Sequence, residues 1–329
     1  MMLGTVRCRA PLARSLRPFK HFYSSHSPIG NVKRSLTIAD IKAKYVSGAP
    51  LSMITAYDYL TAQWVQDSNS DMLLVGDSMA MTSLGYTSTT ELPFDEFKYH
   101  VQAVTRASGS SMVVVDMPFG SFEESYAHGV ANAIRLLKLS PKVISLKVEC
   151  GDYRRDRYTF GFIRELCERG IPVMSHIGLT PQRANSLGGF KVQGNQSAAE
   201  ILSLYGTAVQ LQKLGCWSTV IECVPHKVAS FITQQLSIPT IGIGAGMGTS
   251  GQVLVVSDML GLSSTSSDTD QSLLPRFVKQ YDQLGPVAKA KLQQYNKEVQ
   301  LKQFPLMEHS FKLKETVWNE FLDLIKKDN

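Results

Sequence analysis

The sequence has no run of eighteen consecutive apolar residues, although 43% of its 329 residues are apolar. A helix that crosses a lipid bilayer needs about twenty such residues in succession. The nearest candidates are short β-branched segments such as Met112 to Val115. We therefore expect no membrane insertion, and the apolar content is available for the core of one large α/β domain or two small ones.

Cysteine is scarce, and its spacing does not match the common metal or disulfide patterns. Five cysteines are present, no two of them form a Cys-x-x-Cys pair, and Cys8 lies close to the start of the chain. The other four are Cys150, Cys167, Cys216 and Cys223. Zinc sites and disulfide frameworks are recognised from closely spaced cysteines. We therefore interpret these four as buried thiols in a reducing compartment.

Acidic residues are missing from the first part of the chain. Seven of the 34 basic residues precede Asp40, and no Asp or Glu does. The remainder carries 27 basic against 28 acidic residues, so the net charge of +6 arises from the leader alone. Electrostatic attraction to phosphates supplies most of the affinity in nucleic-acid binding. Because the body of the chain has no basic excess, we expect no nucleic-acid partner.

An Arg-rich leader that contains serines and no acids is typical of a mitochondrial transit peptide. Leu12 to Arg17 has the pattern of a short amphipathic helix that ends before Pro18. We therefore assign residues 1–35 to a transit peptide and expect the protein in the mitochondrial matrix. The alternative is a disordered basic tail without a targeting role.

Beyond the leader, short apolar segments alternate with longer amphipathic ones. The pattern predicts strands at Ser52 to Ala56, Met72 to Val75, Met112 to Val115, Val143 to Val148, Pro172 to Ser175, Thr219 to Ile221, Thr240 to Ile243 and Val253 to Val256. It predicts helices after Thr37 and at Phe94 to Arg106, Glu123 to Leu139, Tyr158 to Arg169, Ala198 to Leu214 and His226 to Leu236. Eight apolar strands with intervening helices favour a closed parallel (β/α)8 barrel over an open sheet. The seventh connection, Gly244 to Gln252, is too short for a full helix.

The barrel is assigned to residues 36–311, and a C-terminal helical extension to residues 312–329. The pattern after Pro275 is helical at Gln280 to Gln303 and at Lys312 to Lys327. We expect these helices either to cover the barrel or to join neighbouring subunits. Ser263 to Ser272 is rich in Ser, Thr and Asp, which predicts a solvated loop.

Polar side chains stand at the ends of five consecutive predicted strands, from the second to the sixth. They are Asp77 and Ser78 after the second strand, Asp116 on the third, Lys147 and Glu149 on the fourth, His176 on the fifth and Glu222 on the sixth. Each alone has an ordinary structural explanation, as a turn cap, a snorkelling lysine or a core histidine. Because the carboxyl ends of parallel strands meet at one face of a barrel, we expect all of them to form one cluster.

Three carboxylates without a His-x-His or cysteine pair favour a hard cation such as magnesium, which leaves positions for water and substrate. A 2-keto acid offers both a keto oxygen and a carboxylate oxygen to such a cation. Chelation polarises the keto group and stabilises an enolate, so that a nearby base removes the proton on the adjacent carbon. Glu222 and His176 are both candidates for that base, and Lys147 is a candidate to neutralise the substrate carboxylate.

An ordered set of sequence motifs then points to a family. The motifs are Thr55-Ala56-Tyr57-Asp58, Val75-Gly76-Asp77-Ser78, Lys147-Val148-Glu149, His176-Ile177-Gly178-Leu179-Thr180-Pro181-Gln182, Gly189-Phe190-Lys191-Val192-Gln193-Gly194, Ile221-Glu222-Cys223-Val224-Pro225 and Glu308-His309-Ser310-Phe311. Together, from about Leu36 to Phe311, they closely resemble the ketopantoate hydroxymethyltransferase family. That resemblance implies a (β/α)8 barrel of the phosphoenolpyruvate-mutase type, a place in pantothenate and coenzyme A biosynthesis, and a large ring of identical subunits.

The same resemblance implies transfer of a hydroxymethyl group from 5,10-methylenetetrahydrofolate to 3-methyl-2-oxobutanoate, which gives 2-dehydropantoate. It implies that Asp77 and Asp116 bind Mg²⁺ and that Glu149 supports the metal through water. The keto-acid contacts that it implies are Asp77, Ser78, Asp116 and Lys147. It also implies that Glu222 is the base, with His176 adjacent to it.

Three other interpretations use the same residues. A carbon–carbon lyase of the same superfamily, such as a 2-methylisocitrate lyase, also chelates a 2-keto acid to magnesium. It is expected to carry a catalytic cysteine in a Lys-Lys-Cys-Gly-type loop, and this sequence has no such loop. A Schiff-base aldolase that uses Lys147 is distinguished by borohydride trapping, and the intact acidic set disfavours a barrel kept only as a binding protein.

Overall fold

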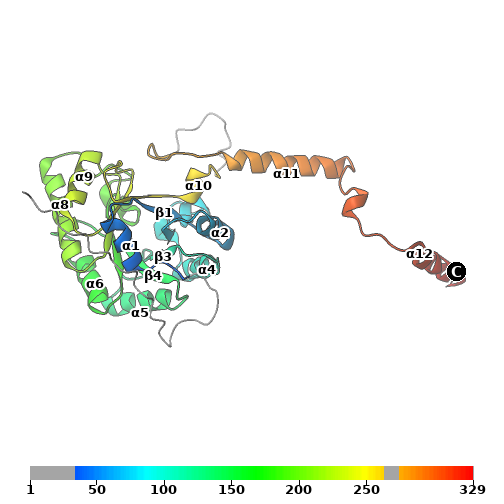
Figure 1. Cartoon of the computed structure of the whole chain (residues 1–329), viewed down its shortest axis with the longest axis horizontal. Coiled ribbons are helices and arrows are strands. Elements are labelled where there is room, and N and C mark those ends of the chain that lie inside the picture. Colours follow the sequence, from blue (N-terminus) through cyan, green and yellow to red (C-terminus); the bar gives the residue numbers. More distant parts are fainter. Residues whose placement is uncertain (1–33, 263–273, 329) are drawn as a thin grey trace, which may run out of the picture. The chain divides into compact units, whose positions relative to one another are not determined.

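Eight parallel strands close into a barrel in the computed structural model, which describes residues 34–262 and 274–328 (Figure 1). The strands are β1 (Leu51–Thr55), β2 (Met72–Val75), β3 (Met112–Asp116), β4 (Val143–Glu149), β5 (Val173–Gly178), β6 (Ser218–Glu222), β7 (Thr240–Ile243) and β8 (Gly251–Leu254). Each strand pairs with the next one in the sequence, and β8 pairs with β1 to close the ring. The predicted barrel is confirmed.

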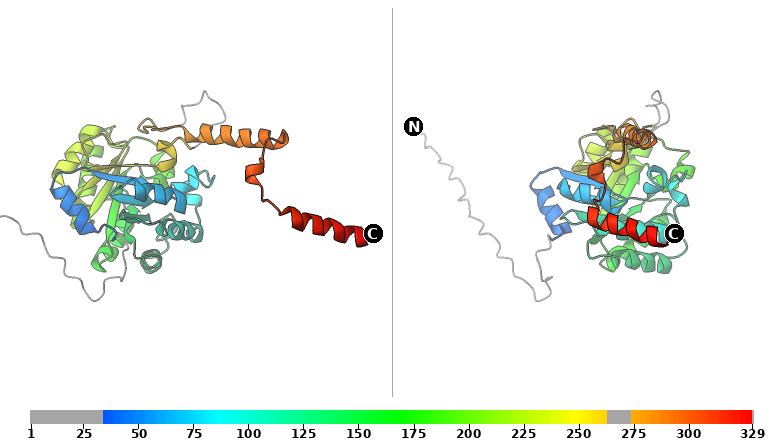
Figure 2. Two further views of the ribbon diagram at one scale, coloured as in Figure 1. Left: turned by 45° about the vertical axis from the view of Figure 1, so that its right-hand side comes forward. Right: turned by 90° about the vertical axis from the view of Figure 1, so that its right-hand side faces the viewer.

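Helices surround the strands and connect most of them (Figure 2). The α-helices are α1 (Ile38–Val46), α2 (Tyr59–Asp67), α3 (Met79–Thr82), α4 (Phe94–Thr105), α5 (Tyr126–Leu137), α6 (Arg157–Glu168), α7 (Ala184–Leu187), α8 (Ala198–Lys213), α9 (His226–Gln235), α10 (Val256–Met259), α11 (Leu284–Gln300) and α12 (Glu315–Asp328). Short 3-10 turns lie at Thr89–Glu91, Pro181–Arg183 and Met307–His309. The predicted start of α1 is confirmed, because the Asp40 amide donates to Thr37 Oγ1 and the Thr37 amide donates to Asp40 Oδ2.

Strand β8 begins and ends two residues earlier than predicted, at Gly251–Leu254 instead of Val253 to Val256. Its four residues all pair with β1, and the last pair joins Leu254 to Ile54, one residue before β1 ends. The Val256 amide then donates to the Thr55 Oγ1 atom at 3.0 Å. A side-chain acceptor therefore replaces the strand partner, and the apolar residues after β8 start α10.

Helix α2 was not predicted, although a local signal for it exists. Its N-cap is Asp58, whose Oδ1 accepts a hydrogen bond from the Thr61 amide at 2.8 Å, while Thr61 Oγ1 accepts one from the Asp58 amide. Such a reciprocal cap marks a helix start. The polar and apolar residues that follow are too evenly mixed to reveal the helix by periodicity alone. The seventh connection, between β7 and β8, contains no helix, as predicted.

Two layers of side chains form the core. In β2, Met72 and Leu74 pack inside the barrel, whereas Leu73 and Val75 pack between the strands and the helices. Successive strand residues point to opposite faces, and here both faces are buried. Covering on both sides explains why the strands appear in the sequence as unbroken apolar runs.

The chain divides into two units, Met1–Lys33 and Arg34–Asn329. Nearly all of the assigned transit peptide, and the expected loop from Ser263 to Ser272, lie outside the described residues. Within residues 34–262 and 274–328, no helix is long and apolar enough to cross a membrane. Helices α11 and α12 form where the sequence predicts them, and α11 has no buried residue.

Candidate active site

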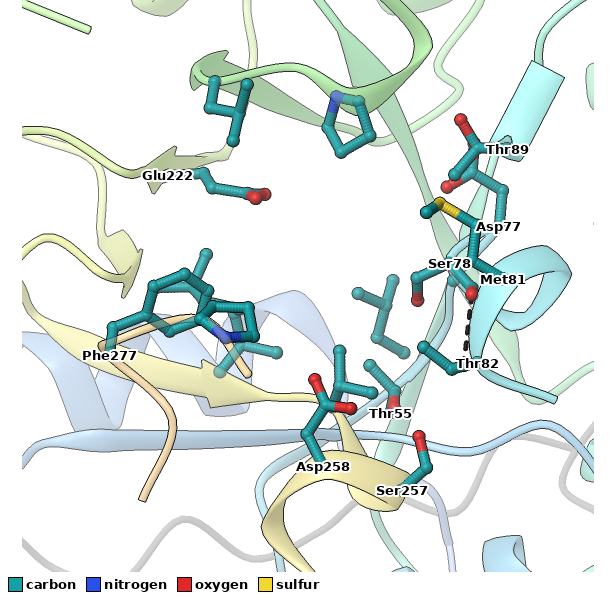
Figure 3. Close-up of a pocket in the computed structure, with 18 of the residues that line it drawn as sticks. Thr55, Asp77, Ser78, Met81, Thr82, Thr89, Glu222, Ser257, Asp258 and Phe277 are labelled. Carbon is teal, nitrogen blue, oxygen red and sulfur yellow. Dashed lines mark hydrogen bonds between the residues drawn. The ribbon is translucent and has the colours of Figure 1, made fainter. Parts of the chain in front are cut away.

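The polar residues predicted at the strand ends line one cavity of about 890 Å³. They are Asp77, Ser78, Asp116, Lys147, Glu149, His176 and Glu222. Figure 3 labels three of them and shows Glu222 across the cavity from Asp77 and Ser78. The geometric prediction of one cluster is therefore confirmed. It follows from the parallel barrel, in which the strands deliver their carboxyl ends to a common face.

Lys147 provides the positive charge of this cluster. Only 6% of its side chain is exposed, and its Nζ atom lies 3.0 Å from Asp116 Oδ1 and 3.2 Å from His176 Nδ1. Burial alone would lower the pKa of Lys147, but the carboxylates of Asp116, Glu149 and Asp77 raise it above its ordinary value. Lys147 therefore stays cationic although its side chain is buried.

His176 is held between two carboxylates. Its Nδ1 atom lies 3.5 Å from Glu149 Oε1, and its Nε2 atom lies 3.2 Å from Glu222 Oε2. Burial and the charge of Lys147 would lower the pKa of His176, but contacts with Glu149 and Glu222 raise it to about 9. Only 2% of the His176 side chain is exposed, against 15% for Glu222. Glu222 therefore faces the open cavity, and His176 supports it from behind.

The remaining carboxylates form a buried acidic group. The Asp77 amide donates to Asp116 Oδ2 at 3.0 Å, so the two residues are held side by side. Burial, together with the charges of Asp116 and Glu149, raises the pKa of Asp77 well above its ordinary value. Burial would also raise the pKa of Glu149, but His176 and Lys147 lower it instead. Three carboxylates therefore lie close enough together to raise the pKa of one of them, and such an arrangement favours a bound cation.

The carboxylate oxygens of this acidic group fit the ligand preference of Mg²⁺. Asp116 Oδ1 is buried and, apart from its ion-pair contact with Lys147, has no hydrogen-bond partner. In the described part of the chain, no three His, Cys, Asp or Glu side chains converge as a ready metal cage. Mg²⁺ rarely needs such a cage, because it binds through one or two carboxylates and keeps several waters. Asp77 and Asp116 fit that requirement.

Gln182, to which the sequence analysis gave no role, joins two of the acids. Its Nε2 atom donates to Asp77 Oδ2 at 2.7 Å and to the Met117 carbonyl at 3.0 Å. Its backbone amide donates to Glu149 Oε2 at 2.9 Å. Gln182 follows β5 in the 3-10 turn Pro181–Arg183. The sequence signal that could have marked Gln182 as a site residue is its place in a motif close to the end of a strand.

Ser78 is held by a chain of hydrogen bonds through Tyr57 and Thr55, which the sequence analysis also missed. Thr55 Oγ1 donates to the Tyr57 hydroxyl at 2.9 Å, and that hydroxyl lies 3.0 Å from Ser78 Oγ. Both residues are buried. Since the Val256 amide donates to Thr55, the chain connects the end of β8 with the loop after β2.

The four described cysteines are free, as predicted, but only Cys150 and Cys216 are buried, whereas Cys167 and Cys223 are partly exposed. Burial raises the pKa of Cys150 and of Cys223 to about 12. Both side chains therefore remain protonated thiols, and the thiol form is a poor nucleophile. Cys223 lines the cavity beside Glu222 but has no charged partner that would activate it.

Solved structures show the same architecture. A phosphonopyruvate hydrolase aligns with a TM-score of 0.54 at 8% identity, and the alignment covers 89% of this chain and 98% of that one. A phosphoenolpyruvate phosphomutase from Streptomyces platensis subsp. rosaceus aligns with a TM-score of 0.51 at 14% identity, with the same coverage. The chain is therefore a (β/α)8 barrel with a buried acidic site at the carboxyl ends of its strands.

Sequence comparisons define the family. A family model described as ketopantoate hydroxymethyltransferase matches residues 35–307. The 3-methyl-2-oxobutanoate hydroxymethyltransferase of Saccharomyces cerevisiae is 57% identical over 309 residues, which are 94% of this chain and 96% of that protein. A rice relative, 3-methyl-2-oxobutanoate hydroxymethyltransferase 2, mitochondrial, is 41% identical over 89% of this chain and 71% of that protein. The chain belongs to the ketopantoate hydroxymethyltransferase family, and it is an enzyme.

Proposed function

We propose that the enzyme transfers a hydroxymethyl group from 5,10-methylenetetrahydrofolate to 3-methyl-2-oxobutanoate, giving 2-dehydropantoate for pantothenate and coenzyme A biosynthesis. The names of its relatives support the reaction. The observation that carries the proposal is the cavity itself, where a buried lysine and paired aspartates face a partly exposed glutamate. The side with the lysine and the aspartates suits binding of the anionic keto acid, and the side with the glutamate suits removal of a proton from it.

Asp77 and Asp116 are the proposed Mg²⁺ ligands, and Glu149 acts on the metal through water. Their oxygen atoms match the preference of this hard cation. Bound Mg²⁺ supplies Lewis-acid polarisation of the keto group and so makes the adjacent C–H bond more acidic. Gln182 keeps Asp77 and Glu149 in a fixed relation, because it donates to both.

Lys147 and Ser78 orient the keto acid. The buried ammonium group of Lys147 neutralises the substrate carboxylate, and Ser78 Oγ, held by Tyr57, offers a hydrogen bond from the other side. Fixing the substrate in this way also fixes its C3–H bond relative to Glu222. A small number of polar groups, each held by its own hydrogen-bond partners, is enough to orient a substrate in this way.

Glu222 is the proposed base. It accepts the C3 proton, and the electrons of that C–H bond pass into an enolate. Water adds to the methylene carbon of the folate, both bonds from that carbon to the folate nitrogens break, and the two protons of the water pass to those nitrogens. The enolate carbon then forms a bond with the released one-carbon unit, and the proton held by Glu222 passes to its oxygen, which becomes the hydroxyl group. His176 is the poorer candidate, because its side chain is almost fully buried and its Nδ1 atom already contacts Lys147 Nζ and Glu149 Oε1.

The test is product formation from 3-methyl-2-oxobutanoate, methylenetetrahydrofolate and Mg²⁺ by the purified protein. We expect 2-dehydropantoate, dependence on both co-substrates, and loss of activity when EDTA removes the metal. Borohydride added with the keto acid should not trap a covalent adduct. Trapping at Lys147 would instead establish the Schiff-base aldolase, and cleavage of a carbon–carbon bond would establish the lyase.

We also propose that the protein acts in the mitochondrial matrix. The acid-free basic leader supports this location, and one relative at 41% identity carries the word mitochondrial in its name. Fusing residues 1–35 to a fluorescent protein tests the leader directly. The reporter should accumulate in mitochondria, and a uniformly cytosolic signal would contradict the proposal.

We further propose a homo-oligomer. Side chains of α12 that are about half exposed, Val317, Trp318 and Phe321, offer an apolar surface to another subunit. Light scattering on the purified protein should give a mass several times the 36.4 kDa of one chain. A monomer would contradict the proposal.

A further inference from the structure

The cavity is much larger than a short keto acid requires. Its volume of about 890 Å³ is in the range of pockets that enclose drug-sized molecules. The acidic group and Lys147 occupy one part of its wall. The rest is mainly apolar and includes Leu274, Pro275, Phe277 and Pro286. A second and larger ligand therefore fits beside the keto acid.

Two polar side chains of the cavity wall, those of Ser257 and Asp258, have no hydrogen-bond partner among residues 34–262 and 274–328. Ser257 is 4% exposed and its Oγ atom has no hydrogen-bond partner, although it lines the cavity. The neighbouring Asp258 also lines the cavity, and no described residue donates a hydrogen bond to its carboxylate or forms an ion pair with it. Burial raises the pKa of Asp258 above its ordinary value. Figure 3 shows both residues beside the cavity, with Glu222 on its opposite side.

Buried polar groups in native proteins almost always have partners, and an exception calls for a ligand, an ion or water. Asp258 lies on the short helix α10, and the start of that helix is held in place. The amide of Val256, two residues earlier, is fixed by Thr55, which in turn holds Tyr57. Ser257 is such an exception among the described residues, and the partly buried carboxylate of Asp258 lines the same cavity without a described donor.

The residues of the cavity wall limit which ligand groups can donate hydrogen bonds to Ser257 and Asp258. A carboxylate accepts two parallel N–H groups in a bidentate arrangement. Phe277 also lines the cavity, and its ring packs directly on Gly244, where an added Cβ would lie 2.8 Å from the ring. Such a ring offers a flat face for stacking. The matching ligand is a flat heterocycle with two adjacent N–H donors on one edge.

We propose that Asp258 and Ser257 bind the N–H edge of the pterin ring of the folate co-substrate, while Phe277 packs against the face of that ring. This inference rests on the proposed function, which requires a reduced folate. A pterin carries the ring N–H and the exocyclic amino group on one edge, and these match the two carboxylate oxygens. Binding there leaves the acidic group free for the keto acid.

The test compares Asp258→Asn with Asp282→Asn in the full chain. Asp282 is the matched control, because it is an exposed aspartate outside the cavity whose Oδ1 accepts only the Gln283 amide among described residues. Three quantities are measured: the KM for methylenetetrahydrofolate, the KM for the keto acid, and exchange of its C3 proton for deuterium without folate. Calorimetric titration with tetrahydrofolate measures binding independently of turnover.

Asp258→Asn should raise the folate KM and the tetrahydrofolate Kd at least about 10-fold, as expected for loss of a charged hydrogen bond. The keto-acid KM and the exchange rate should stay within about twofold of the wild type, and Asp282→Asn should change nothing. Unchanged folate binding in Asp258→Asn, or no tetrahydrofolate binding by the wild type, overturns the inference. Wild-type protein that lacks exchange contradicts the proposed function instead, so the two failures are distinguishable.

Discussion

Replacing Gln182 by leucine removes the side-chain amide that connects the acidic group. The change deletes a hydrogen bond to Asp77 and another to the Met117 carbonyl, but keeps the backbone donation to Glu149. A hydrogen bond to a charged group contributes about 1.5–3 kcal/mol and a neutral one about 0.5–1.5 kcal/mol. We therefore expect the free energy of unfolding to fall by about 2 to 4 kcal/mol.

The effect on the metal is the more specific part of this prediction. Asp77 loses the donor that fixes its Oδ2 atom, and loss of such a supporting contact weakens metal affinity by about 10 to 100-fold. Calorimetric titration with Mg²⁺ measures the affinity, and urea unfolding measures the stability. The control is Gln63→Leu, which also removes a donation to an aspartate, Asp67, but on the outside of the barrel.

The two variants should therefore separate stability from metal binding. Gln63→Leu should bind Mg²⁺ like the wild type, whereas Gln182→Leu should bind it more weakly even at temperatures where it is fully folded. A folded Gln182→Leu protein with wild-type Mg²⁺ affinity would refute the positioning role of Gln182.

Three other outcomes are expected. A chain that begins at Leu36 should fold and retain turnover, and failure to do so would show that the leader belongs to the enzyme. Asp77→Asn or Asp116→Asn should lower Mg²⁺-dependent activity far more than Glu149→Gln, which should cost about 10 to 100-fold; equal losses with unchanged metal affinity count against the ligand assignment. Gly178→Ala should destabilise the fold by more than about 1 kcal/mol, because its φ is 93° and the new Cβ would collide with a carbonyl of β6; unchanged urea unfolding contradicts this.

The barrel was predictable because its strands are buried on both faces. The β-branched run at β3 and the bounds of β2 and β7 are visible in the sequence without any long-range information. The grouping of Asp116, Lys147 and His176 was predictable for a related reason. Parallel strands deliver their carboxyl ends to one face, so position along each strand was sufficient.

Residues that act through long-range contacts were not predictable. Gln182 lies 105 positions from Asp77 and 33 from Glu149, and nothing in the local pattern links them. Asp258 was missed because the last strand was expected to end at Val256, whereas it ends two residues earlier and the next residues form α10. That boundary depends on pairing with β1, which only the closed barrel defines.

The most direct test of the mechanism is exchange of the C3 proton of 3-methyl-2-oxobutanoate for deuterium, followed by NMR with Mg²⁺ and without folate. The wild type should catalyse the exchange, and Glu222→Gln should slow it by about 10² to 10⁴-fold, the usual contribution of a general base. His176→Asn should retain measurable exchange. If Glu222→Gln exchanges at a near-normal rate while His176→Asn does not, with both variants folded and binding Mg²⁺, then His176 is the base and the assignment is reversed.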